Sequence, residues 1–169
     1  MDENESRAIS ELEAHGISCI RITHEPAVTM ELCMGIGEEY GARHVKNLFL
    51  TNRSETRFCL LLMSAEKEFR TSAVSKAIGV SRLSFASEEK LNVVMGLVGG
   101  AVSVMGIVND CARKAYSEGK LSVVFDADVL KREMICVHPN VPTSTLVLKT
   151  SDLVRFLEEK GVAYKVINI

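Results

Sequence analysis

A lysine and an asparagine stand at the start of an apolar run with the residue types of a β-strand. Lys46 and Asn47 precede Leu48-Phe49-Leu50. A charged amine is costly to bury unless it is paired, so a lysine that enters a core is a candidate for a functional site. A lysine at a strand end also protects a sheet edge from pairing. The residues around Lys46 do not distinguish these two interpretations, so the other segments of the chain are needed.

A second candidate is a glycine cluster in the middle of the chain. Gly96, Gly99, Gly100 and Gly106 flank the stretch Ala101-Val102-Ser103-Val104-Met105. Glycine lets the backbone approach a ligand closely, and consecutive amides can hold an anion or a carbonyl oxygen. The alternative is a mobile connector, and the local sequence does not distinguish the two.

Polar residues at strand ends give weaker signals. His138 follows the apolar residues 134–137 and could orient a substrate or act on a proton. His24 lies in a turn before Pro26 and could border a cleft, but for both histidines a structural hydrogen bond is the preferred interpretation. Asp126 and Asp128 follow another apolar run and are expected only to cap the next helical turn.

Several classes of function are excluded or disfavoured. The chain contains no GxSxG, HExxH, Walker A or GxGxxG motif. Its five cysteines include no CxxC, and with the four histidines they show no zinc-ligand spacing, so reduced thiols and no metal or cofactor are expected. A net charge of −2 gives no global basic field for nucleic acid. An acidic N-terminus and the absence of an apolar run of about 20 residues favour a cytoplasmic protein without a membrane partner.

The residue patterns predict one mixed α/β domain over residues 1–169. Strands 45–51 and 57–63 flank a polar turn and predict a hairpin. Further strands are expected at 17–23, 121–125, 134–137, 145–148 and 163–167. Helices are expected at 3–13, 29–39, 71–78, 87–95, 111–117 and 151–160.

Six short segments are each a weak signal of family membership, but their order along the chain is specific. Together they span nearly the whole chain. They are His24-Glu25-Pro26, residues 46–50, residues 82–86, the Gly100–Gly106 loop, residues 107–110, and Val137-His138-Pro139 with Thr143 and Thr145. This set resembles the bacterial prolyl-tRNA editing family, the YbaK-like aminoacyl-tRNA deacylases. The similarity is closest to the free-standing type that removes alanine from proline tRNA.

The resemblance implies a mixed, barrel-like β-sheet core flanked by helices. It also implies hydrolysis of the ester that joins an amino acid to the 3′ end of mischarged proline tRNA, most simply Ala-tRNA(Pro). The implied partners are the tRNA acceptor end and prolyl-tRNA synthetase. In such enzymes a ribose hydroxyl of the tRNA is thought to assist the attacking water, which fits the absence of a Ser-His-Asp set.

Site roles follow from the resemblance residue by residue. Lys46 is expected to stabilise phosphate or developing negative charge rather than to act as a nucleophile. Backbone amides near Gly100, Ala101 and Val102 are expected to cradle the ester carbonyl, which makes Lys46, Gly100 and Ala101 the predicted catalytic residues. The predicted substrate-binding residues are Asn47, Val102, Ser103, His138 and His24.

Two departures from the family pattern leave alternatives open. Val104 occupies a position where proline is common, and valine does not lock φ as proline does. Pro142 replaces a common asparagine beside the expected amino-acid pocket. The alternatives are a deacylase for Cys-tRNA(Pro) or another small aminoacyl-tRNA, a non-catalytic domain that binds an aminoacyl group or tRNA, and a hydrolase of another small ester.

Overall fold

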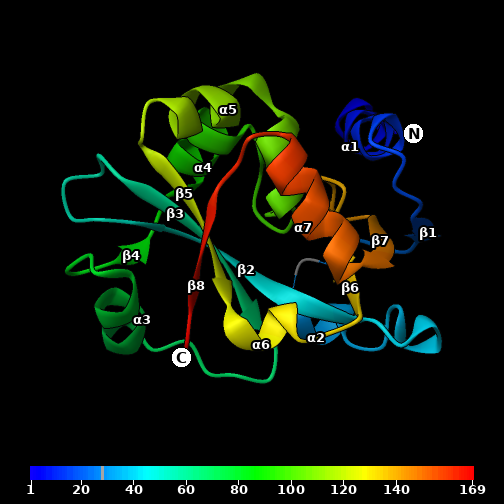
Figure 1. The fold of residues 1–169 in the computed structure, drawn as a ribbon, viewed down its shortest axis with the longest axis horizontal. Helices are drawn as coiled ribbons and strands as arrows, with labels where there is room; N and C mark the ends of the chain where they lie inside the picture. The colour runs from blue at the N-terminus through cyan, green and yellow to red at the C-terminus, as the bar shows by residue number, and fades with distance from the viewer. Residues whose placement is uncertain (28) are drawn as a thin grey trace.

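Eight strands form one mixed sheet in the order β1-β7-β6-β2-β3-β5-β8, with β4 paired to β2 (Figure 1). The structure is a computed structural model that describes residues 1–27 and 29–169. The strands are β1 (Ile20–Thr23), β2 (Arg43–Thr51), β3 (Phe58–Ser64), β4 (Ser84–Phe85), β5 (Leu121–Asp126), β6 (Met134–Val137), β7 (Ser144–Lys149) and β8 (Tyr164–Ile167).

The predicted hairpin forms the centre of the sheet and is confirmed. Strands β2 and β3 pair antiparallel from Val45 opposite Ser64 to Thr51 opposite Phe58. In the turn, the Asn52 side chain accepts hydrogen bonds from two later backbone amides, which closes the loop. Strand β5 then pairs parallel to β3, and β3 is buried along its whole length. A strand with apolar residues on both faces needs cover on both sides.

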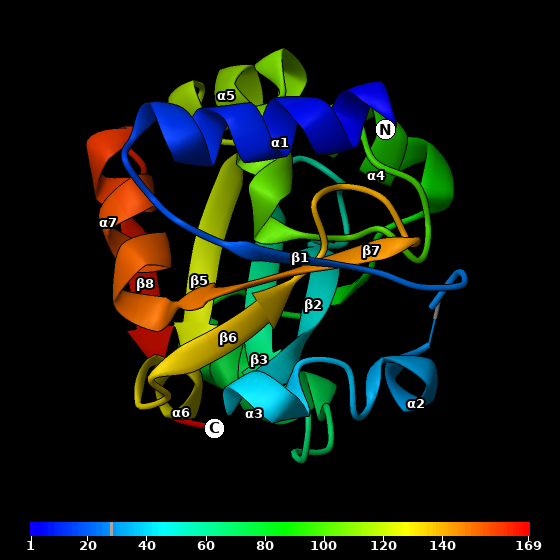
Figure 2. The same ribbon diagram turned by 90° about the vertical axis from the view of Figure 1, so that its right-hand side faces the viewer.

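Helices supply that cover on the two faces. The large core includes Leu12 of α1, Leu91 of α4 and Phe156 of α7. The opposite face of β3 packs Leu61 against Val74 of α3. In Figure 2 the strands β1, β7 and β6 cross in front of β3 and β5. The helical segments are α1 (Glu3–Ala14), α2 (Met30–Cys33), η1 (Glu38–Tyr40), α3 (Thr71–Ile78), α4 (Glu88–Met95), η2 (Val104–Val108), α5 (Asp110–Ser117), α6 (Ala127–Leu130) and α7 (Thr150–Glu159).

The helix expected at residues 29–39 is wrong. Helix α2 ends at Cys33, and only the short 3-10 turn η1 follows it. Gly35 and Gly37 have φ values of +91° and +88°, which a regular right-handed helix does not contain. A Cβ on Gly37 would lie 2.5 Å from the Cys136 sulfur, so this chain segment approaches β6 as closely as only glycine permits.

The mixed sheet flanked by helices that the family resemblance implies is confirmed. In the part of the chain that the structure describes, no pairing joins the edge strands β1 and β8, so the sheet is open rather than closed into a barrel-like ring. Among the described helices, none combines the length and the apolar character needed to cross a membrane.

Candidate active site

A cavity of about 370 Å³ lies along the first half of β2. Five residues of the predicted site line it, namely Lys46, Asn47, Gly100, Val102 and His138. They come from three separate parts of the chain: strand β2, the glycine loop before η2, and the end of β6. The other described residues that line it are Ala27, Thr29, Met30, Cys33, His44, Val45, Leu48 and Phe69. The structure therefore brings together segments that the sequence could only name one by one.

Three other predicted residues lie outside the cavity lining. Ala101 is fully buried, and its amide donates to the Val98 carbonyl at 3.1 Å. Ser103 is also fully buried, and its hydroxyl accepts the amide of Met105 at 3.1 Å, which caps η2. His24 bonds to Thr145 behind the wall at 2.9 Å. Because the Ala101 amide already has a partner, only its neighbours in this loop could hold a carbonyl oxygen as the sequence predicts.

Gly100 and Val102 are those neighbours, and both line the cavity. Within residues 1–27 and 29–169, neither amide has a protein hydrogen-bond acceptor. Gly100 has φ of +80°, a left-handed conformation that glycine adopts without a Cβ penalty. Val104, the residue that departs from the family proline, is buried and begins η2 just beyond this loop.

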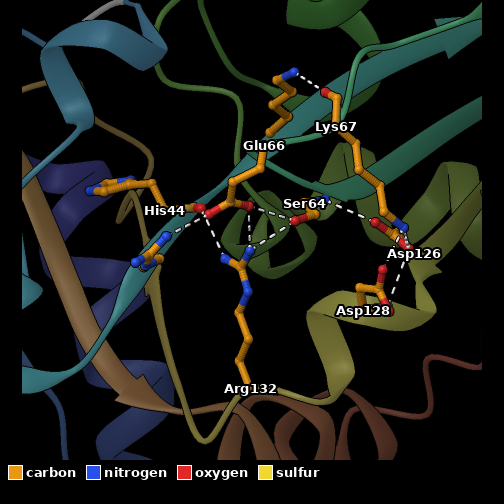
Figure 3. Close-up of polar contacts among 9 residues, drawn as sticks. His44, Ser64, Glu66, Lys67, Asp126, Asp128 and Arg132 are labelled. Atoms are coloured by element: carbon orange, nitrogen blue, oxygen red, sulfur yellow. Dashed lines mark hydrogen bonds and ion pairs between the residues drawn. The ribbon is translucent and has the colours of Figure 1, made fainter.

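The Lys46 ammonium is held by a backbone group of the segment that follows β3. Its Nζ donates a hydrogen bond to the carbonyl oxygen of Lys67. The Lys67 side chain in turn donates to the fully buried carboxylate of Asp126 at 2.7 Å and pairs with Asp128 at 2.8 Å. Lys67 is partly buried, which opposes its charge, but these two carboxylates raise its pKa above the ordinary lysine value. Figure 3 shows the Lys67 side chain directed at Asp126 and Asp128.

Asp126 does more than the expected helix capping. One carboxylate oxygen accepts the Asp128 amide at 3.2 Å, as the sequence predicts for a cap of α6. The other accepts the Ser64 amide at 3.1 Å, at the point where β3 ends. The Asp126 carboxylate therefore holds the 64–67 segment at both ends, through the Ser64 amide and through the Lys67 side chain. No sequence pattern signals this role, because Asp126 and Lys67 are far apart in the chain.

Arg132 connects the same segment to β2. Its guanidinium donates to the His44 carbonyl at 3.3 Å, to the Ser64 hydroxyl at 2.8 Å and to the Glu66 carboxylate at 2.7 Å (Figure 3). The Ser64 hydroxyl lowers the pKa of Glu66 most. Burial opposes this shift, but the backbone amide of Glu66, Arg43 and Arg132 add to it and bring the pKa to about 2. This network holds the backbone of β2 two residues before Lys46.

Sequence reasoning missed His44 as a wall residue of the cavity. It is buried, and burial lowers its pKa to about 4, with a further contribution from His138 and His24. Burial also lowers the pKa of His138, although the Ser144 carbonyl opposes that shift by accepting a hydrogen bond. The sequence contains one signal for His44. It stands two residues before Lys46, and residues two apart in a strand share one face.

Pro142, the second departure, acts on the wall of the cavity through its backbone. Its carbonyl accepts the amide of Ala27 at 2.9 Å, and the next carbonyl, of Thr143, accepts the amide of His24 at 3.0 Å. These bonds continue the pairing of β1 with β7. Ala27 lines the cavity, so this stretch sets the position of one wall.

Three side chains of the types that commonly bind metals, one cysteine and two histidines, meet at this cavity. The ligating atoms of Cys33, His44 and His138 lie within 4.8 Å of one another, and all three residues are buried. The sequence spacing gave no indication of this group. All five cysteines of the chain are free thiols, as expected.

Comparisons with known proteins identify the family to which this chain is related. A family model described as "Aminoacyl-tRNA editing domain" matches residues 24–156, so the resemblance predicted from the sequence is confirmed. The Prolyl-tRNA editing protein ProX of Acetoanaerobium sticklandii is 32% identical over 170 residues and is covered completely, as is this chain. The Prolyl-tRNA synthetase associated domain-containing protein 1 of Xenopus laevis is 24% identical over 142 residues, which are 82% of this chain and 80% of that protein.

A solved structure has the same fold as this chain. It is described as a candidate trans-editing enzyme for prolyl tRNA synthetase and superposes with a TM-score of 0.70 at 16% identity. The match covers 100% of this chain and 99% of that one. At this identity the likeness concerns the fold alone.

Proposed function

This chain belongs to the family of aminoacyl-tRNA editing domains, and from that premise we propose that it is a trans-editing deacylase of mischarged proline tRNA with Ala-tRNA(Pro) as its substrate. The relative that is 32% identical over the full chain is named a prolyl-tRNA editing protein, which supports the choice of tRNA. The choice of alanine rests on the sequence resemblance to the free-standing alanine-specific type.

One observation carries the proposal. The cavity is lined by Lys46, whose ammonium donates to the Lys67 carbonyl, and by Gly100 and Val102, whose amides have no protein acceptor in the part of the chain that the structure describes. Editing hydrolysis breaks an ester whose carbonyl oxygen gains negative charge when water attacks. Cationic and amide donors held in advance around such an oxygen stabilise the transition state more than the ground state.

In the reaction that we propose, water adds to the ester carbonyl carbon and the bond to the ribose oxygen breaks. The products are the free amino acid and the tRNA with its terminal hydroxyl restored. Lys46 stabilises negative charge on the substrate, while the Gly100 and Val102 amides receive the carbonyl oxygen. Asn47 and His138, which line the same cavity, contact the amino acid and the terminal adenosine in this proposal. A ribose hydroxyl of the substrate assists the water.

The same proposal includes weak, local binding of tRNA. A net charge of −2 provides little attraction for a whole polyanion, so contact is confined to the acceptor end and prolyl-tRNA synthetase supplies further affinity. Few phosphate contacts give a shallow salt dependence together with a high dissociation constant. Tight binding of free tRNA that persists at high salt would contradict this arrangement.

A panel of three substrates tests the proposed function. The full chain is incubated with Ala-tRNA(Pro), Cys-tRNA(Pro) and Pro-tRNA(Pro), and release of the amino acid is followed over time. We expect loss of alanine with proline spared. Faster loss of cysteine than of alanine would reassign the substrate, and no hydrolysis of any of the three would favour a binding domain instead.

A further inference from the structure

Three metal-ligating side chains converge on the cavity from separate elements. Cys33 ends α2, His44 lies in β2, and His138 follows β6. Each residue is less than a tenth exposed, and each lines the cavity. The ligating atoms lie within 4.8 Å of one another, so one small ion could contact all three after modest side-chain adjustment.

The distance between Cys33 and His138 suits a shared cation. The sulfur of Cys33 is 3.7 Å from Nε2 of His138. In a tetrahedral Zn²⁺ site, with Zn–S near 2.3 Å and Zn–N near 2.0 Å, the sulfur and nitrogen ligands are separated by roughly 3.5 Å. The Cys33 thiol proton, which donates to the Ala27 carbonyl, is released when the thiolate binds a cation.

The hydrogen bonds around His138 prepare its free nitrogen for ligation. Nδ1 of His138 lies 3.1 Å from the Ser144 carbonyl, which can only accept, so Nδ1 carries the proton. Nε2 therefore presents a lone pair toward Cys33. A histidine that ligates a metal commonly donates its other N–H to a backbone carbonyl in this way.

Hydrogen bonds that run through His24 and Thr145 orient His44. Nδ1 of His24 donates to the Glu25 carbonyl at 2.7 Å, so Nε2 of His24 accepts the Thr145 hydroxyl proton at 2.9 Å. The Thr145 oxygen can then accept from Nε2 of His44 at 3.3 Å. This assignment leaves Nδ1 of His44 as the nitrogen with a lone pair.

We propose that Cys33, His44 and His138 form a binding site for one borderline-soft divalent cation of the Zn²⁺ class. One thiolate and two imidazoles are ligands that select zinc over magnesium or calcium. Three protein ligands leave a fourth position, which faces the cavity and takes a water molecule or a small ligand. This inference does not rest on the deacylase activity, because cation binding alone tests it.

Cobalt provides the direct test, since Co²⁺ occupies zinc sites and reports its ligands by absorption. The full chain, freed of metal with a chelator, is titrated with Co²⁺. We expect one equivalent to give a thiolate-to-cobalt charge-transfer band and the intense visible bands of tetrahedral cobalt. One equivalent of Zn²⁺ should abolish both.

Variants assign the ligands. Cys33→Ser should remove the charge-transfer band, and His138→Gln should weaken Zn²⁺ binding by more than the roughly 10- to 100-fold loss caused by removing an outer-sphere partner. Cys111→Ser, which changes a thiol on α5 outside the site, should behave as wild type. Circular dichroism of each metal-free variant verifies its folding, and either ligand variant alone can decide the test if the other fails to fold.

Three results would each overturn the proposal. The first is a wild-type chain that shows no charge-transfer band at any Co²⁺ concentration up to several equivalents. The second is a band that persists in folded Cys33→Ser. The third is a Zn²⁺ affinity of folded His138→Gln equal to that of wild type.

Discussion

The backbone carbonyl of Lys67 accepts the hydrogen bond from the Lys46 ammonium, and the side chain of the same Lys67 is anchored to buried Asp126 at 2.7 Å. One residue thus joins the cavity to a carboxylate at the end of β5. The position of the Lys46 ammonium depends on the segment after β3, and that segment depends on Asp126.

Asp126→Asn should therefore affect both stability and rate. The variant leaves Lys67 without its buried counter-charge and offers one acceptor where the carboxylate has two. Removing one partner of a buried pair costs about 3–5 kcal/mol, and since the Lys67 side chain is 26% exposed we expect a smaller loss of about 2 kcal/mol in the free energy of unfolding. We also expect kcat for deacylation to fall by about tenfold or more with KM little changed, because Lys46 loses its fixed position.

Urea unfolding and steady-state deacylation measure these effects, and Asp128→Asn is the matched control. The Asp128 side chain is 45% exposed, so Asp128→Asn should lower the free energy of unfolding much less than Asp126→Asn does. Equal effects of the two substitutions would show that Asp126 has no special positioning role.

Arg132→Lys tests the link between β2 and the 64–67 segment. Lysine keeps the charge but cannot reproduce the guanidinium contacts to the His44 carbonyl and the Ser64 hydroxyl. We expect a loss of about 1–3 kcal/mol in the free energy of unfolding, measured with urea. Arg113→Lys, at an exposed pair with Asp110, should change stability by less than about 0.5 kcal/mol. A stability of Arg132→Lys equal to that of this control would refute the link.

The ionised Glu66 predicts a particular loss of stability in acid. Its pKa is about 2 in the folded protein and near 4.5 when unfolded, so it favours folding above about pH 4.5. That contribution should disappear as the pH falls from about 4.5 to 2, because the unfolded chain binds the proton first. Unfolding free energies measured across this range should fall less steeply in Glu66→Gln than in wild type. Identical slopes would mean that the Glu66 network adds nothing to acid stability.

A pair of glycine substitutions separates backbone strain from function. Gly100→Ala and Gly119→Ala both place a side chain at positive φ, +80° and +71°, and each should cost about 1–2 kcal/mol of stability. Only Gly100 lines the cavity, so only Gly100→Ala should lower kcat for deacylation. Thermal unfolding and activity are measured on both. An equal loss of activity in Gly119→Ala would indicate a general effect of strain.

Local signals predicted the elements well where turn and cap residues were strong. Ser87 caps α4 as expected, by accepting the Lys90 amide, and the Asn52 turn closes the central hairpin. The helix expected over residues 29–39 failed because its glycines serve a tertiary contact. Close approach to Cys136 requires Gly37, and no local pattern contains that information.

Single residues of the candidate site could be predicted from the sequence, but the groups that they form in the fold could not. Lys46, Asn47 and the glycine loop were found because their residue types are unusual for their places in the chain. Lys67 and Asp126 were missed as a pair because they meet only when β3 and β5 align. The group of Cys33, His44 and His138 was missed for the same reason, since its members come from three elements without a spacing motif.

The role of Lys46 is tested by the rate of Ala-tRNA(Pro) hydrolysis in wild type, in Lys46→Ala and in the exposed-lysine control Lys114→Ala. We expect Lys46→Ala, with an unfolding free energy near that of wild type, to lose about 100- to 1,000-fold in kcat, the range seen when one preorganised charge-stabilising group is removed. Lys114→Ala should retain the wild-type rate. A folded Lys46→Ala protein that hydrolyses Ala-tRNA(Pro) at the wild-type rate would contradict the role assigned to Lys46.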